Sequence, residues 1–446
     1  MIHSKKIKSD VTVLDILYNI KDKSLPFLLD SAKGSFNQGN KSYIGFDPEI
    51  VLKSKDNNVE ISGLVNKKVS DNPLNQLKIL MDDYFEEDDN QFIGGAVGLL
   101  SYDFTSSNCN VVLNSEKNTE VYDAYFGIYF KIIEFDNNTQ EYTIYYLDDT
   151  DIRDVEAAFV KPDYVDNEYK TSELIKTITK EEYAKSFDDI KTMIENGDVY
   201  EVNLTQQFIV DTTKDKFDIY KKLREVNKAD FMAYMDFGEY CVLSSSPERF
   251  FDCQNGFVQA RPIKGTIRRS DDKDEDEKLK KELLNSDKDI SELLMIVDLM
   301  RNDLGMSCDA ETIKAISNYS LETYENVHHL VATIVGKLRE DEDVFSLIKN
   351  IFPGGSITGA PKLASIESID KVEKYNRNIY TGSIGYISFN QNCDFNILIR
   401  TILKIKDRCY FSGGGAITWD SEMNSEYDET IQKSKKVYEA LIWTME

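Results

Sequence analysis

The chain has 446 residues, of which 41% are hydrophobic and 30% charged, as expected for a globular protein with a large core. Its 53 basic and 79 acidic residues give a formal net charge of −26, which argues against binding to nucleic acid or anionic lipid. No apolar run approaches the roughly 18 residues of a membrane span, and the six cysteines form no C-x-x-C pair. We therefore expect a cytoplasmic protein without a zinc or disulfide framework.

The first part of the chain, residues 1–160, is rich in strand-forming segments. Aromatic and β-branched residues fill SYIGFDPEIVLKS, FIGGAVGLLSYDF, AYFGIYFKIIEF and EYTIYYLDD. A more polar stretch, roughly 161–176, then leads into the second part of the chain.

The second part begins with a helix signal, because Thr179 and Glu182 fit a capping box and Gly197 supplies a stop. Strand-like segments then alternate unevenly with further helices. This uneven order favours an α+β fold over a doubly wound sheet. We expect the further helices at 287–302, 342–351, 361–371 and 425–443.

A β-hairpin is predicted at Asn255-Gly256, which lies between two strand-like runs. A two-residue turn there would place Glu248 opposite Ile263, and a three-residue loop would place it opposite Lys264. Either register brings a carboxylate and an amine together. The pair is either an ordinary cross-strand salt bridge or part of a reaction centre.

Two pairs of acidic residues begin two of the expected helices. Asp289 and Glu292, and likewise Glu426 and Glu429, are spaced so that each pair lies on one helical face. Acidic residues in a first turn complement the helix dipole. Alternatively, the two helix starts meet and hold a hard divalent cation such as Mg²⁺, which prefers oxygen ligands.

Other polar groups also leave two readings open. The glycine-rich turns FPGGSITGAPK and FSGGGAIT either bind an anion through backbone N–H groups or are only tight turns. Arg400, inside the apolar segment FNILIRTIL, pairs either with a structural carboxylate or with a substrate carboxylate. His328 and His329 are either structural or acid–base groups.

Together these segments resemble the chorismate-utilising enzymes, which include anthranilate synthase, aminodeoxychorismate synthase, isochorismate synthase and salicylate synthase. A weaker match, FLLDS and SYIGFDP, extends the resemblance over the N-terminal part. The main match covers about Thr179 to the C-terminus, in the order GDVYEVNLTQQF, SSSPERF, RPIKGT, ELLMIVDLMRNDLG, HHLVATIVG, GGSITGAPK, YTGSIGY, FNILIRT, GGGAIT and SEYDET.

The resemblance implies an α+β fold of two antiparallel sheets in a sandwich flanked by helices. An N-terminal part (1–160) and a chorismate-binding catalytic part (175–446) would share one globular unit. It also implies Mg²⁺, with Glu292 and Glu429 at the metal positions and Asp289 and Glu426 beside them. Asp289 is shorter than the glutamate usual there.

The resemblance also indicates which residues of this chain match the substrate-binding and tryptophan-binding positions of the family. His329 matches a histidine near the leaving group. Relatives bind tryptophan between two segments that here contain Ser31, Phe231 and Met232. The positions that match chorismate contacts are Gly265, Thr266, Ser356, Thr358, Tyr380, Arg400, Gly414, Gly415, Ala416 and Lys433.

Lys264 indicates the subfamily. Anthranilate synthases read P-I-A-G-T where this chain reads P-I-K-G-T, as aminodeoxychorismate synthases do. In that chemistry the lysine amine attacks ring C2 and expels the C4 hydroxyl, and ammonia then attacks C4 and releases the enzyme. Since only a neutral amine is nucleophilic, we expect burial or Mg²⁺ to lower the pKa of Lys264, and Glu248 to protonate the departing hydroxyl.

The resemblance also implies a partner subunit, and it leaves other functions of the family open. Without a G-x-C-x-G glutaminase turn, the chain would need a separate glutamine amidotransferase subunit to supply ammonia for the folate and 4-aminobenzoate pathway. Glu201 departs from the glutamine usual in G-D-x-Y-Q-V-N. The alternatives are anthranilate synthase component I, an isochorismate or salicylate synthase, and an inactive partner that binds chorismate or tryptophan.

Overall fold

The computed structural model describes residues 1–32, 40–165, 168–270, 272–323 and 327–443. Their strands form two large sheets, and neighbouring strands pair antiparallel. The first sheet runs through β1 (Ile2–Ile7), β10 (Glu141–Leu147), β9 (Lys131–Asp136), β3 (Lys41–Gly45), β2 (Phe27–Asp30), β13 (Phe231–Asp236), β14 (Cys241–Ser246), β23 (Thr401–Ile405), β24 (Arg408–Ile417), β12 (Glu201–Asp211) and β11 (Ile175–Lys176), with β20 (Gly359–Ala360) beside β12.

The second sheet holds the remaining described strands. It runs through β17 (Ile263–Arg268), β19 (Val327–Lys337), β16 (Phe257–Ala260), β15 (Arg249–Gln254), β22 (Cys393–Asn396), β21 (Ser383–Ser388), β7 (Gly95–Leu100), β8 (Ala124–Tyr129), β4 (Ile50–Lys55), β5 (Asn58–Gly63) and β6 (Lys67–Ser70), with β18 (Lys314–Thr323) beside β19.

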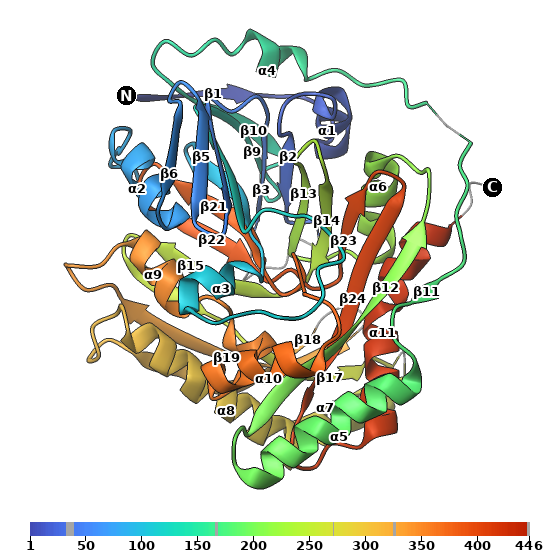
Figure 1. Cartoon of the computed structure of the whole chain (residues 1–446). Helices are drawn as coiled ribbons and strands as arrows, with labels where there is room; N and C mark the ends of the chain where they lie inside the picture. The colour runs from blue at the N-terminus through green and yellow to red at the C-terminus, as the bar shows by residue number, and fades with distance from the viewer. Residues whose placement is uncertain (33–39, 166–167, 271, 324–326, 444–446) are drawn as a thin grey trace.

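The N-terminal and C-terminal parts of the chain contribute strands to both sheets. In the first sheet β2 pairs with β13, and in the second β7 pairs with β21. Residues 1–147 and 201–417 therefore complete the same two sheets, which Figure 1 shows as blue strands beside green and orange ones.

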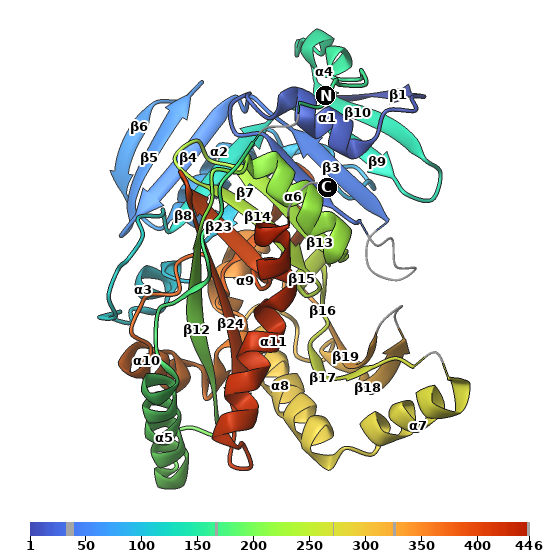
Figure 2. The same ribbon diagram turned by 90° about the vertical axis from the view of Figure 1, so that its right-hand side faces the viewer.

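The middle of the first sheet is buried on both faces, which the alternation along β13 demonstrates. Ala233 and Met235 belong to the core between the two sheets, whereas Met232 and Tyr234 pack beneath helices. The covering helices are α1 (Val13–Ile20), α6 (Lys216–Val226) and α11 (Met423–Ile442), and Figure 2 shows α6 and α11 over this sheet. The predicted α+β sandwich flanked by helices is confirmed.

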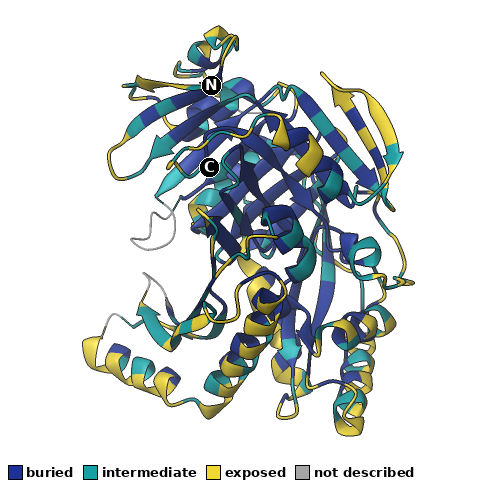
Figure 3. Cartoon of the chain, turned by 90° about the vertical axis from the view of Figure 1, so that its left-hand side faces the viewer, coloured by how far each residue is buried: buried dark blue, intermediate teal, exposed yellow. Residues whose placement is uncertain are grey.

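The other helices lie around the sandwich, and Figure 3 shows exposed outer faces on several of them. The capping box predicted at Thr179 is present. No helix of the described ranges is both long and apolar enough to cross a membrane. These helices are α2 (Pro73–Asp82), α3 (Phe104–Cys109), α4 (Arg153–Ala157), α5 (Lys180–Asn196), α7 (Lys273–Leu284), α8 (Asp287–Gly305), α9 (Val344–Ile351) and α10 (Lys362–Val372), with a 3₁₀ turn at Gly355–Ile357.

Candidate active site

The predicted hairpin forms between β15 and β16. Its two-residue turn is Asn255-Gly256, and both residues have the positive φ (51° and 77°) that a type I′ turn requires. Pro262, which has no N–H to donate, follows β16, and β17 then pairs with β19 rather than with β15. Both predicted cross-strand placements of Glu248, opposite Ile263 and opposite Lys264, are therefore wrong, although the charges of Glu248 and Lys264 still act on each other.

The partner of Lys264 is Glu201, the first residue of β12. Lys264 Nζ lies 2.9 Å from Glu201 Oε1, and the glutamate side chain has no exposed surface. Burial lowers the pKa of Lys264, but the carboxylates of Glu201, Glu292 and Glu248 outweigh burial and hold this pKa above its ordinary value. Burial alone therefore does not leave a neutral amine, because these carboxylates stabilise the ammonium form, and a lowering of the pKa by Mg²⁺ stays a prediction.

Glu248 lies in the short link between β14 and β15, where it is buried. Its Oε1 accepts a hydrogen bond of 2.9 Å from Ser356 Oγ in the FPGGSITGAPK turn. Burial raises the pKa of Glu248, and the Ser356 hydroxyl and the Lys264 charge only partly offset that rise. The Thr358 hydroxyl donates instead to the carbonyl of Gly354, so it stabilises the turn itself.

The first turns of α8 and α11 meet, and Lys288 connects them. Its Nζ lies 3.9 Å from Glu292 Oε1 and 3.7 Å from Glu426 Oε1. Burial raises the pKa of Glu292 to about 7, with Lys264 lowering it and Glu201 raising it further. Burial also raises the pKa of Glu426. A positive group between the two helix starts therefore offsets repulsion between their carboxylates.

The other two acidic residues have partners of their own. Asp289 accepts a hydrogen bond from the Ser286 hydroxyl, whose oxygen in turn caps α8. Glu429 Oε1 lies 2.6 Å from Lys433 Nζ, and this cation outweighs burial and lowers the pKa of Glu429. Glu429 is therefore kept as a carboxylate, the form that binds a metal ion.

The carboxylates fit a hydrated divalent ion better than a closed protein cage. In the described ranges, no three histidine, cysteine, aspartate or glutamate side chains come close enough to hold a metal by themselves. Mg²⁺ retains several waters and needs only one or two carboxylates. Glu292 Oε1 is buried and has no hydrogen-bond partner among the described residues, which suits a direct ligand.

Glycines of β24 allow α11 to approach the sheet closely. A Cβ at Gly415 would lie 3.2 Å from Glu426 Oε2, and one at Gly413 would lie 2.3 Å from Ser434 Oγ, so both would meet α11. Lys433 Nζ donates to the Gly414 carbonyl over 3.0 Å. Gly414, Gly415 and Ala416 therefore place no large side chain beside the α11 carboxylates.

Arg400 lies between β22 and β23, not inside a strand as predicted, and has a positive φ of 51°. Its guanidinium makes no ion pair within the part of the chain that is described, although the charge of Glu248 acts on it. Burial lowers the pKa of Arg400. Tyr380 is buried, and burial raises its pKa. The lack of an ion pair to Arg400 among the described residues favours a substrate carboxylate over a structural one as its partner.

The two histidines of β19 have different surroundings. His328 is buried, and its ring nitrogens lie 3.0 Å from Asp276 Oδ1 and 2.9 Å from Thr323 Oγ1. His329 is half-buried, and its Nδ1 lies 2.8 Å from Thr266 Oγ1, two residues after Lys264. His328 is therefore structural, whereas His329 lies on the strand that pairs with β17, next to Lys264.

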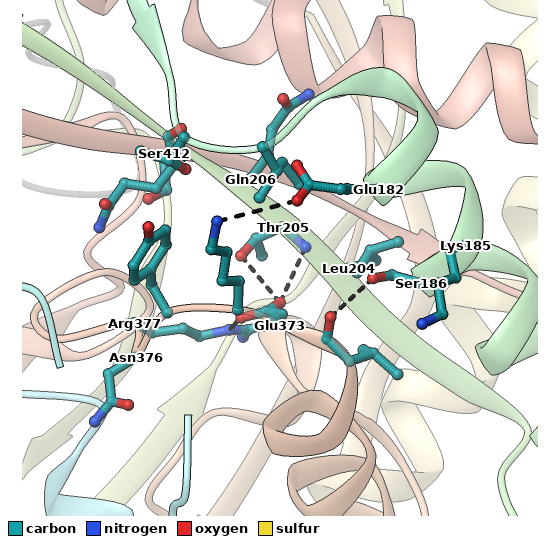
Figure 4. Close-up of a pocket in the computed structure, with 16 residues that line it drawn as sticks. Glu182, Lys185, Ser186, Leu204, Thr205, Gln206, Glu373, Asn376, Arg377 and Ser412 are labelled. Atoms are coloured by element: carbon teal, nitrogen blue, oxygen red, sulfur yellow. Dashed lines mark hydrogen bonds and ion pairs between the residues drawn. The ribbon is translucent and has the colours of Figure 1, made fainter. Parts of the chain in front are cut away.

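Ser31, Phe231 and Met232, the possible tryptophan position, line one small cavity together with Asp30 and Tyr386. The cavity lies between β2, β13 and β21, away from Lys264. A larger cavity, shown in Figure 4, lies between α5, β12 and residues 372–377. None of the predicted site residues lines this larger cavity, and the Glu373 carboxylate in its wall is already bonded to Thr205 and Arg377.

Comparison with known proteins assigns the chain to a family. Residues 26–439 match the family model described as chorismate binding enzyme. The chain belongs to the chorismate-binding enzymes. Aminodeoxychorismate synthase component 1 of Escherichia coli (strain K12) is similar to this chorismate-binding enzyme, with 37% identity over 378 residues, 83% of each chain.

Two further relatives cover more of this chorismate-binding enzyme. Anthranilate synthase component 1 of Acetivibrio thermocellus is 31% identical over 460 residues, covering 96% of this chain and 92% of the relative. The crystal structure of anthranilate synthase component I from Streptococcus pneumoniae TIGR4 aligns with a TM-score of 0.80 and 26% identity, covering 90% of this chain and 92% of that one. The family resemblance predicted from the motifs is confirmed.

Sequence reasoning missed two charged residues of this chorismate-binding enzyme. Glu201 was noted only as a departure from glutamine, although a charge inside the apolar start of a strand signals a buried partner. Lys288 is the second, and its spacing of four residues from Glu292 predicts an ion pair on one helical face.

Proposed function

We propose that this chorismate-binding enzyme is the chorismate-aminating component of an aminodeoxychorismate synthase. Its product would be 4-amino-4-deoxychorismate. The observation that carries the proposal is Lys264, whose mostly buried amine lies among the carboxylates of Glu201, Glu248 and Glu292. A lysine at this point gives the enzyme an internal nucleophile, which a small residue does not. The 37% identical relative named aminodeoxychorismate synthase component 1 supports the same reaction.

The reaction begins with Lys264 and Glu248. A solvent water first takes a proton from the Lys264 ammonium. The neutral Nζ then attacks ring C2, the ring double bonds shift, and the bond from C4 to its hydroxyl oxygen breaks. Glu248 protonates that oxygen, so that water leaves. Its buried setting and raised pKa keep a proton available for this step. The lysine is then joined to C2 by a covalent bond.

Ammonia completes the exchange. Its nitrogen attacks C4, the double bonds shift back, and the bond between C2 and Lys264 Nζ breaks, which returns the lysine to the enzyme. The two displacements with allylic shift thus place nitrogen at the carbon that carried the hydroxyl. Arg400, Tyr380 and the glycine-rich segments would hold the substrate carboxylates, because Arg400 offers a half-buried guanidinium that has no ion pair among the described residues.

Mg²⁺ is the proposed cofactor, held by Glu292 and Glu429 with Asp289 and Glu426 close by. When bound, it would supply positive charge to a carboxylate of the anionic substrate. Ammonia would come from a separate glutamine amidotransferase subunit, since the relative from Escherichia coli is named as component 1. The product would feed 4-aminobenzoate and folate synthesis.

The test uses the purified chain with chorismate, Mg²⁺ and an ammonium salt, and products are separated by mass spectrometry. We expect 4-amino-4-deoxychorismate from the wild type and none from Lys264→Ala. The matched control is Lys216→Ala, which removes another lysine paired with a buried carboxylate, that of Asp236. Intact-protein mass after mixing with chorismate alone should reveal the covalent adduct in the wild type and not in Lys264→Ala.

Anthranilate synthase is the second candidate, because two anthranilate synthases match 90% or more of the chain. It would attack C2 with ammonia directly and need no enzyme amine. Strong anthranilate fluorescence from the wild type in the same assay, without any added lyase, would refute the proposed reaction and establish this one.

A further inference from the structure

Glu201 is held at a fixed place by its own backbone. It pairs with Ala360 of β20, and its carbonyl accepts a hydrogen bond of 3.0 Å from Ser365 Oγ. Gly359, with a φ of +139°, packs so tightly that a Cβ there would lie 2.0 Å from the Glu201 carbonyl oxygen. The start of β12 is therefore locked between β20 and α10, and the Glu201 side chain projects from a rigid base.

The Glu201 carboxylate has one partner among the described residues. Oε1 accepts the hydrogen bond from Lys264 Nζ at 2.9 Å, whereas Oε2 is buried without a hydrogen-bond partner. A buried carboxylate of this kind is costly unless its cation stays beside it. Glu201 and Lys264 lie 63 positions apart and on different sheets, so only the packing of the two sheets brings them together.

A free lysine amine sits on a flexible four-carbon stem and samples many directions. Attack on a ring carbon requires the nitrogen to approach along one direction, and a displacement of about 1 Å can cost roughly 100-fold in rate. Because the Glu201 backbone is fixed, its Oε1 limits where Lys264 Nζ can lie. The carboxylates of Glu248 and Glu292 act on the same amine but make no hydrogen bond with it in the described residues.

We propose that Glu201 is a positioning residue for the reactive lysine: its buried oxygen aims the Lys264 amine at the substrate ring. This inference rests on the proposed function. The positioning comes from a fixed hydrogen-bond acceptor, so a glutamine at this position, whose amide oxygen has the same reach, would preserve it. A leucine of similar size removes the hydrogen-bond acceptor, so nothing at position 201 would fix the direction of the Lys264 amine.

The test compares Glu201→Gln, Glu201→Asp and Glu201→Leu, with ammonium as nitrogen donor and saturating Mg²⁺. We expect Glu201→Gln to keep kcat within about threefold, and Glu201→Leu to lose roughly 30-fold to 100-fold in kcat. The KM for chorismate should stay within about threefold for both, because the substrate contacts are retained. Glu201→Asp withdraws the acceptor by one methylene and should lose roughly 10-fold in kcat.

The control variants are Asp236→Asn and Asp236→Leu. Asp236 is a buried carboxylate that pairs with Lys216, and these substitutions change it as Glu201→Gln and Glu201→Leu change Glu201. Both should keep wild-type kcat. Wild-type kcat in Glu201→Leu would overturn the inference, as would an equal loss in Glu201→Gln and Glu201→Leu, which would assign the effect to charge. If Glu201→Leu does not fold, wild-type kcat in Glu201→Asp would overturn it instead.

The proposed reaction and the positioning role of Glu201 are refuted by different results. Anthranilate as the wild-type product refutes the proposed function and, with it, the role of Glu201. If the wild type makes 4-amino-4-deoxychorismate and the Glu201 variants turn over like the wild type, only the positioning role is refuted.

Discussion

Ser356 Oγ donates a hydrogen bond of 2.9 Å to Glu248 Oε1, which joins the FPGGSITGAPK turn to the link between β14 and β15. The two residues are 108 positions apart. The glycine-rich turn thus orients the carboxyl group to which the proposed reaction assigns protonation of the leaving hydroxyl.

Ser356→Ala should extend activity to higher pH. The Ser356 hydrogen bond stabilises the carboxylate form and lowers the pKa of Glu248, so its removal raises that pKa. A general acid works only while protonated, so activity falls as pH rises through its pKa, and a higher pKa moves that fall upward. The pH profile of kcat/KM measures the shift. Ser368→Ala, another buried serine that donates only to the Ala364 carbonyl, should leave the profile unchanged.

Glu292→Gln and Glu429→Gln should each weaken Mg²⁺ binding roughly 10-fold or more, because an amide is a weaker ligand than a carboxylate. Mg²⁺-dependent thermal stabilisation gives the affinity without relying on turnover. Glu439→Gln, on the exposed side of α11 and paired with Lys436, is the control and should bind Mg²⁺ like the wild type. Unchanged stabilisation in both site variants would remove these residues from the proposed metal site.

Lys288→Met should strengthen Mg²⁺ binding by a few fold. Lys288 Nζ lies 3.9 Å from Glu292 and 3.7 Å from Glu426, so it competes with a metal ion for the same negative charge. The effect is modest because the lysine is 51% exposed and exposed pairs are weak. Calorimetric titration with Mg²⁺ measures it, with Lys436→Met as the matched variant on α11. Weaker binding in Lys288→Met would contradict a competing role.

Gly265→Ala should destabilise the protein more than Gly238→Ala. Both glycines have a left-handed φ (+74° and +83°), so an alanine costs about 1–2 kcal/mol at either place. A Cβ at Gly265 would also lie 3.0 Å from Asp289 Cβ, whereas one at Gly238 meets nothing within 4 Å. Urea unfolding of the two variants isolates the effect of this close contact. Equal losses would mean that Asp289 moves aside freely.

The two histidines of β19 should respond in opposite ways. His328→Ala leaves the buried Asp276 without one of its partners and should lower stability by about 1–3 kcal/mol. His329→Ala should reduce kcat with little change in melting temperature, because its ring is half-buried and bonds to Thr266 near the reactive lysine. Melting temperature and kcat of both variants distinguish the structural role of His328 from the catalytic role of His329. A stable, fully active His329→Ala variant would exclude His329 from the reaction.

Local features of this chain were predictable because short-range chemistry determines them. The Asn255-Gly256 turn forms because both residues tolerate positive φ, and the Thr179 capping box forms from residues three positions apart. The continuation of the hairpin was predicted wrongly, since counting residues assumes that β15 and β16 stay paired. After Pro262 the chain instead follows β19, whose apolar residues pack into the core between the sheets.

The motifs were sufficient to predict the family and the α+β sandwich. Which charged side chains meet depends on how the two sheets pack. Lys264 pairs with Glu201 and not with Glu248, because β12 and β17 belong to different sheets that approach at this point. A buried amine takes whichever carboxylate the packing presents, and no local pattern encodes that choice across 63 positions.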